Sequence, residues 1–324
     1  MTQGFYHIPV LYEETLRALS PQEGDVFLDM TLGGGGHARG VLQAIGSTGR
    51  LYATDRDPQA IAAAKRHLAQ YADRLEVRQG CFAEVGSWLP GQSCDGVCMD
   101  LGISSPQVDH ADRGFSFLKE GPLDMRMSPA QHLKANDLVN EWDEEDLAGL
   151  FRSLGEEPRA RKIAQAISQS RRVAKFETTS QLAQCVEQAV GGRSSKHHPA
   201  TRVFQALRME VNDELGQLKR GLVSAWRVLK PGGRLATISF HSLEARLVKR
   251  FGHFWGASYE AGDEADTPAL RVPREPVARW SPRKSIKASR QEILKNPRSR
   301  SAQLRVMEKI QDLPEDREWA WIGN

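Results

Sequence analysis

The sequence has few of the features that stabilise proteins outside the cytosol or anchor them in a membrane. Its 324 residues include only four cysteines, too few and too irregularly spaced for a disulfide framework. No run approaches the ~18 apolar residues of a membrane span, and residues 1–16 lack the cationic start and apolar stretch of a signal peptide. We therefore expect a cytoplasmic globular protein whose thiols are free and buried.

Metal-ligand patterns are also missing. Cys94 and Cys98 have no second pair of ligands at the usual spacing, and no cysteine or carboxylate lies at ligand spacing around His197 and His198. We expect no metal site.

The net charge of the chain is small, but basic residues are concentrated in one segment. The formal net charge is only +3, yet residues 271–305 carry eleven basic residues against two acidic ones, a net of +9. Such clustering is typical of a surface that binds a polyanion, because each neutralised phosphate releases counterions. A solvated loop explains the charge equally well.

Short apolar segments alternate with amphipathic stretches of helical period in the first hundred residues. This alternation predicts an α/β fold with a parallel sheet. The expected strands are residues 25–30, 50–55, 75–78 and 95–100, and the expected helices are residues 37–45 and 59–71. Asp57 and Pro58 provide an N-cap and a first-turn proline for the second helix.

The next convincing strand, residues 234–240, follows a turn at 230–233 and comes about 130 residues after the fourth strand. A complete strand–helix–strand unit needs only ~30 residues, so an insertion is expected. Its sequence is helical over 144–154, 159–171, 180–190 and 200–229, and the final strand is expected at 302–307. The predicted domains are a sheet domain, residues 1–109 and 216–324, and an inserted helical domain, residues 110–215.

Glycines follow the first strand. Residues 33–36 permit tight turns and close approach of a ligand to the backbone. Asp55 ends the second strand, 22 residues after Gly33, where its carboxylate can accept hydrogen bonds from a ribose diol. Together, the glycines and Asp55 indicate an adenosine-type cofactor. Residues 33–38 also satisfy the G-x-G-x-x-A pattern of dinucleotide-binding proteins. Phe82 can cover an adenine or belong to the core, and His37 can touch the ligand or cap the helix.

The segment after the fourth strand narrows the chemistry. Asp100 is followed by Ser104, Ser105, Pro106 and Gln107, at the strand edge where this architecture binds ligands. An exocyclic base amine is a poor nucleophile, and acceptors must hold its hydrogens; short polar residues before proline present such acceptors at fixed geometry. The segment is similar to the Ser-Pro-Pro-aromatic motif of cytosine-N4 methyltransferases, with Gln107 in the aromatic position. An ordinary Ser-Pro turn remains the alternative.

Nearly the whole chain resembles the bacterial 16S ribosomal RNA cytidine-N4 methyltransferases known as RsmH or MraW. The resemblance rests on long motifs in one order. These lie at 7–11, 33–37, 55–58, 100–107, 113–117, 121–127, 198–202, 238–244 and 296–301.

The resemblance implies a Rossmann-like class I methyltransferase sheet with an inserted helical domain, and methyl transfer from S-adenosyl-L-methionine to N4 of a cytidine in the decoding region. It places cofactor contacts at Gly35, Gly36, His37, Asp55, Phe82, Asp100 and Gln107. Around the amine we expect Asp100, Ser104 and Ser105, with Pro106 shaping the turn and His241 and Ser242 lining the same pocket unless Ser242 caps a helix.

The expected partner is 16S ribosomal RNA or the small ribosomal subunit, and the target base must be unstacked to react. We expect the segment 271–305 and basic residues of the insert to hold the RNA backbone. The insert residues are Arg159, Arg161, Lys162, Arg171, Arg172 and Lys196. The alternatives are a dinucleotide-dependent enzyme, such as a dehydrogenase, and a non-catalytic RNA-binding assembly factor.

Overall fold

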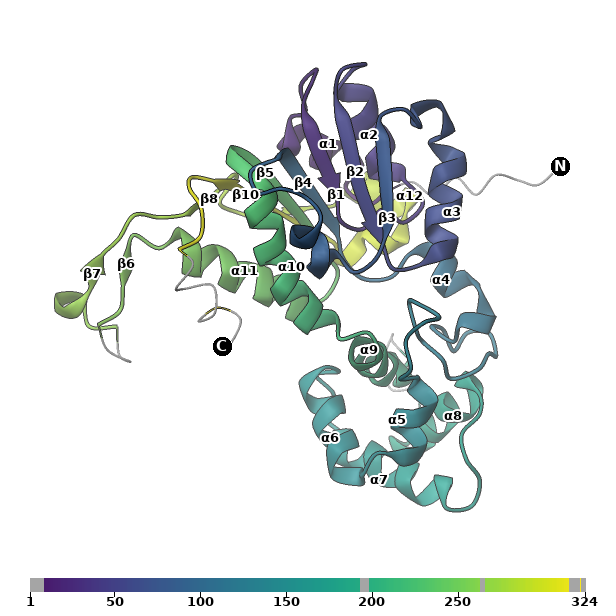
Figure 1. The fold of residues 1–324 in the computed structure, drawn as a ribbon. Coiled ribbons are helices and arrows are strands. Elements are labelled where there is room, and N and C mark those ends of the chain that lie inside the picture. The colour runs from purple at the N-terminus through teal and green to yellow at the C-terminus, as the bar shows by residue number, and fades with distance from the viewer. Residues whose placement is uncertain (1–8, 193–197, 263–265, 315–320, 322–324) are drawn as a thin grey trace. The chain divides into compact units, whose positions relative to one another are not determined.

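A computed structural model describes residues 9–192, 198–262, 266–314 and 321, apart from the side chains of residues 105 and 106. The chain divides into two compact units (Figure 1). The first comprises Met1–Gly102 and Leu215–Asn324, and the second is Ile103–Glu214. The second unit thus begins seven residues before the start expected for the helical insert.

The first unit is built on a mixed sheet. Its strands are ordered β3 (Leu75–Gln79), β2 (Arg50–Asp55), β1 (Val26–Asp29), β4 (Cys94–Asp100), β5 (Leu229–Ser239), β10 (Gln303–Lys309) and β8 (Ala278–Trp280), and β9 (Ile286–Lys287) also pairs with β10. Strands β1 to β5 are parallel, and β10 runs antiparallel to β5. This confirms the predicted α/β class with a Rossmann-like methyltransferase sheet. The order reverses at β1, which lies between β2 and β4, and in such sheets ligands bind beside that point.

Each face of this sheet has its own core. One contains Phe27, Leu51 and Ile238 with residues of α1 (Tyr12–Leu19), α2 (Gly36–Ala44) and α3 (Pro58–His67). The other contains Leu28 and Met99 with residues of α10 (Glu214–Val228) and α11 (Ser242–Gly256). Adjacent strand residues point to opposite faces, so burial on both faces explains the nearly continuous apolar strands.

Local sequence signals account for several element ends. The Asp57 carboxylate accepts from the Gln59 amide at 2.9 Å with Pro58 in the first turn, so the predicted cap of α3 is confirmed. The long helical pattern over 200–229 is divided into two helices, α9 (Ala200–Val211) and α10. The predicted turn at 230–233 lies within β5, where the pairing with β4 shifts between Leu229 and Arg234.

The second unit is helical. It contains α4 (Ser105–Asp109), α5 (Ala135–Glu141), α6 (Glu144–Ser153), α7 (Ala160–Arg171), α8 (Thr179–Ala189) and α9. Thr178 and Gln181 form a capping box at the start of α8. Its core includes Leu138, Phe151, Ile163, Val186 and Leu207, and every member of this core belongs to the second unit.

The remaining elements are short. They are the hairpin of β6 (Tyr259–Glu260) and β7 (Val272–Pro273), helix α12 (Arg290–Lys295), and the 3-10 turns Ala69–Tyr71, Phe82–Ser87, Ala111–Arg113, Pro268–Leu270 and Pro297–Ser301. Among the described residues, no helix is long and apolar enough to span a bilayer. Cys94 and Cys98 are buried as expected, whereas Cys81 and Cys185 are partly exposed, and all four are free thiols.

Candidate cofactor and substrate site

The glycine loop connects β1 to α2 through a tight turn. Gly33 and Gly35 have φ values of 50° and 79°, in the region that favours glycine, and the Gly35 amide donates to the Leu32 carbonyl at 2.8 Å. A Cβ on Gly36 would strike the ring of Pro9, whereas a Cβ on Gly34 would meet nothing within 4 Å. The loop is therefore closely packed at Gly36 and open at Gly34, where a ligand can approach the backbone.

Asp55 ties the end of β2 to this loop. Its Oδ2 accepts from the Gly33 amide at 2.8 Å, and its Oδ1 accepts from the Asp57 amide at 2.9 Å. Burial raises the pKa of Asp55, while these backbone donors pull it down. The Arg56 amide is a third backbone donor to this carboxyl. Because a carboxylate has about four acceptor positions, these bonds leave capacity for a ribose hydroxyl. Asp55 fits the ribose-binding role predicted for it.

Asp100 ends β4 and has an incomplete set of partners. Its amide donates to the Thr31 hydroxyl at 2.6 Å, and its Oδ1 is buried without a hydrogen-bond partner among the described residues. Burial raises the pKa of this carboxyl well above its usual range, and the charges of Asp29 and Glu244 raise it further. A buried oxygen without a partner is rare in folded proteins and fits a position that a ligand completes.

His37 lies in the first turn of α2, buried, with its two nitrogens in different surroundings. Its Nε2 is 3.1 Å from the Val10 carbonyl, and its Nδ1 is 3.8 Å from Asp100 Oδ2. A carbonyl only accepts, so Nε2 carries a proton. Gly35, not His37, is the N-cap residue of α2. The geometry places His37 beside Asp100 as a positioning group.

Phe82 opens the 3-10 turn after β3, where the sequence placed it. Its ring packs so closely on α10 that a Cβ on Gly221 would strike it. The ring is partly buried against the core on the side of the sheet that α10 and α11 cover. Its contact with adenine stays a prediction.

Two further carboxyls lie near these groups and were missed by sequence reasoning. Asp29, at the end of β1, accepts from the Thr31 amide at 3.0 Å, and burial, with a contribution from the charge of Asp55, raises its pKa to about 7. Glu244 is buried in the first turn of α11, where its Oε2 accepts from the Phe240 amide at 2.8 Å. The N-cap and N3 spacing of His241 and Glu244 was the available signal for the latter.

The end of β5 corrects one assignment. The N-cap of α11 is His241, whose Nδ1 accepts from the Glu244 amide at 3.4 Å, and Ser242 is an exposed first-turn residue. His241 Nε2 lies 3.1 Å from Glu244 Oε1. The capping role considered for Ser242 belongs to His241.

The predicted substrate segment belongs to the second unit. The Ser104 amide donates to Gln107 Oε1 at 3.0 Å, and Gln107 is buried at the start of α4. This bond uses the Gln107 amide oxygen to fix the turn before the helix. The side chains of Ser105 and Pro106 lie outside the described part of the structure, so their predicted roles rest on the sequence.

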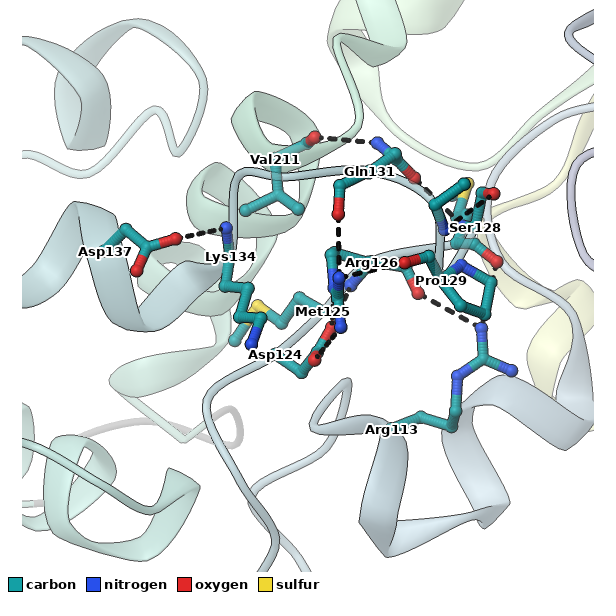
Figure 2. Close-up of polar contacts among 12 residues, drawn as sticks. Arg113, Asp124, Met125, Arg126, Ser128, Pro129, Gln131, Lys134, Asp137 and Val211 are labelled. Carbon is teal, nitrogen blue, oxygen red and sulfur yellow. Dashed lines mark hydrogen bonds and ion pairs between the residues drawn. The ribbon is translucent and has the colours of Figure 1, made fainter.

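The motif at 121–127 forms a hydrogen-bonded loop within the second unit (Figure 2). Arg126 binds both oxygens of Asp124 at 2.8 Å and donates to the carbonyls of Pro129 and Gln131. Arg113 donates to the Arg126 carbonyl at 3.1 Å. The contact with Arg126 lowers the pKa of Asp124, against the effect of its burial. The charges of this motif are therefore used to fold the loop.

The basic segment is only partly free to bind a polyanion. Arg271 pairs with Asp266 at 2.9 Å, Arg274 with Glu260 at 3.1 Å, and Arg279 with Glu308 at 2.6 Å. Other cations of the segment are exposed at the surface. They are Arg283, Lys284, Lys287, Arg290, Lys295, Arg298 and Arg300.

Two cations of the insert also have structural contacts. Arg159 donates to the Val190 carbonyl at 2.8 Å and Arg171 to the Val139 carbonyl at 2.9 Å. Lys196 lies outside the described residues. The expected RNA contacts of the insert stay a prediction.

Comparison with known proteins identifies close relatives over nearly the full chain. The profile of the "MraW methylase family" matches residues 4–310. Three relatives are each called "Ribosomal RNA small subunit methyltransferase H". The Symbiobacterium thermophilum protein is 46% identical over 313 residues, covering 95% of this chain and 98% of its own. The Syntrophotalea carbinolica protein is 46% identical over 311 residues (94% and 98%), and the Sinorhizobium medicae protein 47% over 303 residues (93% and 86%).

Proposed function

Because the chain belongs to the MraW methylase family, we propose that it methylates N4 of one cytidine in the decoding region of 16S ribosomal RNA. The methyl donor of the enzyme is S-adenosyl-L-methionine, which supplies an electrophilic methyl group on a sulfonium. The observation that carries the proposal is the buried Asp100 Oδ1 without a partner, in the same unit as the open glycine loop and Asp55.

The residues of the first unit hold and orient the donor. Asp55 accepts from a ribose hydroxyl, and Gly34 leaves room for the ligand beside the loop. Phe82 covers the adenine. His37 sets the position of the Asp100 carboxyl from one side. Orientation of this kind lowers the barrier because the reacting groups are already aligned when they meet.

The residues around the target amine act as acceptors. Asp100, Ser104 and Ser105 hold its hydrogens so that the nitrogen lone pair leaves conjugation with the ring, and Pro106 fixes the turn that presents them. Methyl transfer is a direct displacement by N4, with no covalent bond to a cysteine. Gln107 completes the turn through its bond to the Ser104 amide. The RNA presents the cytidine unstacked.

Base-level analysis of 16S ribosomal RNA tests this function. RNA from a strain that lacks the protein is expected to lose one N4-methylated cytidine of the decoding region, and the purified enzyme with S-adenosyl-L-methionine is expected to restore it. Retention of that modification without the protein rules the proposal out.

Two other functions are separated by binding and complementation. Calorimetry is expected to show binding of S-adenosyl-L-methionine and none of NAD; the reverse result favours a dinucleotide enzyme. If an Asp100→Ala variant without transfer activity restores subunit assembly fully, the assembly-factor function gains over the enzymatic one.

A further inference from the structure

One face of α11 carries a row of cations that the site does not use. Arg246, Lys249, Arg250 and His253 are exposed, at spacings of three, four and seven residues that place them on the same side of a helix. Val248, Phe251 and Trp255 are buried on the opposite side, in the core of the first unit. The helix is thus divided into an apolar face and a basic face.

These four cations line a pocket with aromatic side chains. The pocket has a volume of about 560 Å³, and its other lining residues are Phe254 and Trp321. The two aromatic rings lie 5.9 Å apart at 41°, and the Trp321 indole donates to the Lys219 carbonyl at 3.3 Å. All of these residues belong to the first unit. Trp321 is only 3% exposed and Phe254 is half-buried, so the aromatic side chains form the floor of the pocket beside its basic wall. Single-stranded nucleic acids bind surfaces that combine positive charge with aromatic contacts.

Several positive charges lie close together around this pocket. Burial lowers the pKa of His253, and the charges of Lys249, Arg305 and Arg283 lower it further. Burial and the charge of Arg250 lower the pKa of Lys219. No acidic residue is among the described residues that line the pocket. Mutually repelling cations of this kind are stabilised by a polyanion.

We propose that the α11 pocket, lined by Arg246, Lys249, Arg250, His253, Phe254 and Trp321, binds a single-stranded segment of the RNA substrate away from the target cytidine. Lys249 and Arg250 contact phosphates, and the exposed part of the Phe254 ring packs against a ribose or base. The volume of the pocket falls within the range of small-ligand sites and suits about one nucleotide. The inference rests on the proposed function for the identity of the RNA.

The double variant Lys249→Gln/Arg250→Gln tests the pocket. The probes are a 16S ribosomal RNA fragment that contains the decoding region and the isolated small subunit, with binding measured over a series of salt concentrations. We expect about tenfold weaker binding, and the slope of log affinity against log salt concentration is expected to fall by about 1.4, or ~0.7 for each lost phosphate contact on a single strand. The affinity for S-adenosyl-L-methionine and the unfolding midpoint should not change.

A matched control removes the same charge elsewhere in the first unit. Lys65 and Arg66 are adjacent exposed cations on α3, so Lys65→Gln/Arg66→Gln should bind RNA as the wild type does. The charge-preserving variant Lys249→Arg/Arg250→Lys should retain most of the affinity. If the α11 variant and the α3 control lose affinity and salt dependence equally, only net charge matters and the pocket has no role.

The proposed function and this inference fail in different ways. If the wild type methylates the expected cytidine but the α11 variant matches the control, the function stands and the pocket does not bind RNA. If the wild type modifies no RNA yet the α11 variant alone loses RNA affinity with the smaller salt slope, the pocket stands and the function falls. If the α11 variant binds RNA as the wild type does but no longer binds anionic vesicles or an acidic peptide, the RNA assignment is overturned.

Discussion

Asp55 and Asp100 end the two strands that flank β1, and their different contacts imply different effects when they or their partners are changed. Asp55 has both oxygens bonded to backbone amides of the glycine loop and of the turn before α3, whereas Asp100 has a free buried oxygen. The first is suited to organising the cofactor site. The second is suited to a contact formed only with ligand bound.

We predict that Asp55→Ala weakens binding of S-adenosyl-L-methionine by ten- to a hundredfold, with a smaller effect on turnover at saturating cofactor. The variant loses hydrogen bonds to a charged acceptor, worth about 1.5–3 kcal/mol each. Ser105→Ala should do the opposite and lower kcat with little effect on cofactor affinity. Calorimetry and steady-state methylation kinetics measure the two quantities. Equal effects of both changes on both quantities would contradict the assigned roles.

Asp29 predicts a pH dependence of stability. Its pKa in the folded state is about 7, above the value of about 3.9 in an unfolded chain, so the folded state binds the extra proton between these values. The contribution of Asp29 to the free energy of unfolding is therefore greatest below pH 4. It falls as the pH rises to 7, by at most about 1.4 kcal/mol per pH unit.

The substitution Asp29→Asn removes the fall in unfolding free energy with pH, because asparagine does not ionise. The oxygen of the asparagine side chain can still accept the hydrogen bond from the Thr31 amide. The difference in unfolding free energy between variant and wild type, measured by urea titration from pH 4 to pH 8, should therefore increase in favour of the variant. A constant difference over this range would mean that Asp29 ionises normally in the folded protein.

Position along the chain was enough to predict some polar residues of the candidate site but not others. Asp55 and Asp100 were found because each ends a strand and precedes a turn, which is visible in sequence. Asp29 also ends a strand, but its raised pKa depends on burial and on the charge of Asp55, which come from strands brought together by folding. Glu244 was missed for a different reason, since histidine is an unusual N-cap residue and its capping box was not recognised.

Among the elements, the break between α9 and α10 shows how a tertiary contact overrides a helical pattern. Residues 200–229 have continuous helical periodicity, yet Asp213 has a φ of 48° and Asn212 is fully buried. The side-chain Oδ1 of Asn212 accepts from the Met127 backbone N–H at 2.8 Å, and its Nδ2 donates to the Met125 carbonyl at 2.8 Å. These partners lie more than 80 residues away, so the sequence pattern alone could not locate the break.

We predict that Asn212→Ala destabilises the second unit by about 2–6 kcal/mol. The substitution leaves the Met127 amide and the Met125 carbonyl buried without partners, at a cost of about 1–3 kcal/mol for each group. Hydrogen exchange of residues 121–134 should become faster. Gln184→Ala, on the exposed side of α8, is a control that should leave exchange unchanged. Slow exchange in the Asn212 variant would show that Arg126 and Arg113 hold the loop without it.

Short edge elements were beyond sequence prediction as well. Strands β6 to β9 have two or three residues each, and only their pairing partners define them. The cationic face of α11 is a different case. Its three-, four- and seven-residue spacing is visible in the sequence, but its cations are fewer than those of the segment 271–305.

At the scale of the whole molecule, the length of the gap between the fourth and fifth strands predicted an insertion because a single crossover needs far fewer residues. The structure has a helical unit in that interval, starting at Ile103 instead of 110. The boundary was the weak point, since Ser104 to Asp109 continue directly from the strand edge and carry no linker composition. The two cores of the first unit and the core of the second share no buried residue.

Separate cores predict separate unfolding transitions. Gly35, Asp55 and Asp100, the residues proposed to bind the cofactor, belong to the first unit, and a ligand stabilises only the state that binds it. S-adenosyl-L-methionine at 100 times its dissociation constant should stabilise the first unit by about 2.7 kcal/mol and raise one calorimetric transition. The other transition should stay in place and should be the one that Asn212→Ala lowers. A single transition that moves as a whole with cofactor would instead mean that the two units unfold cooperatively, and Asn212→Ala would then lower that same transition.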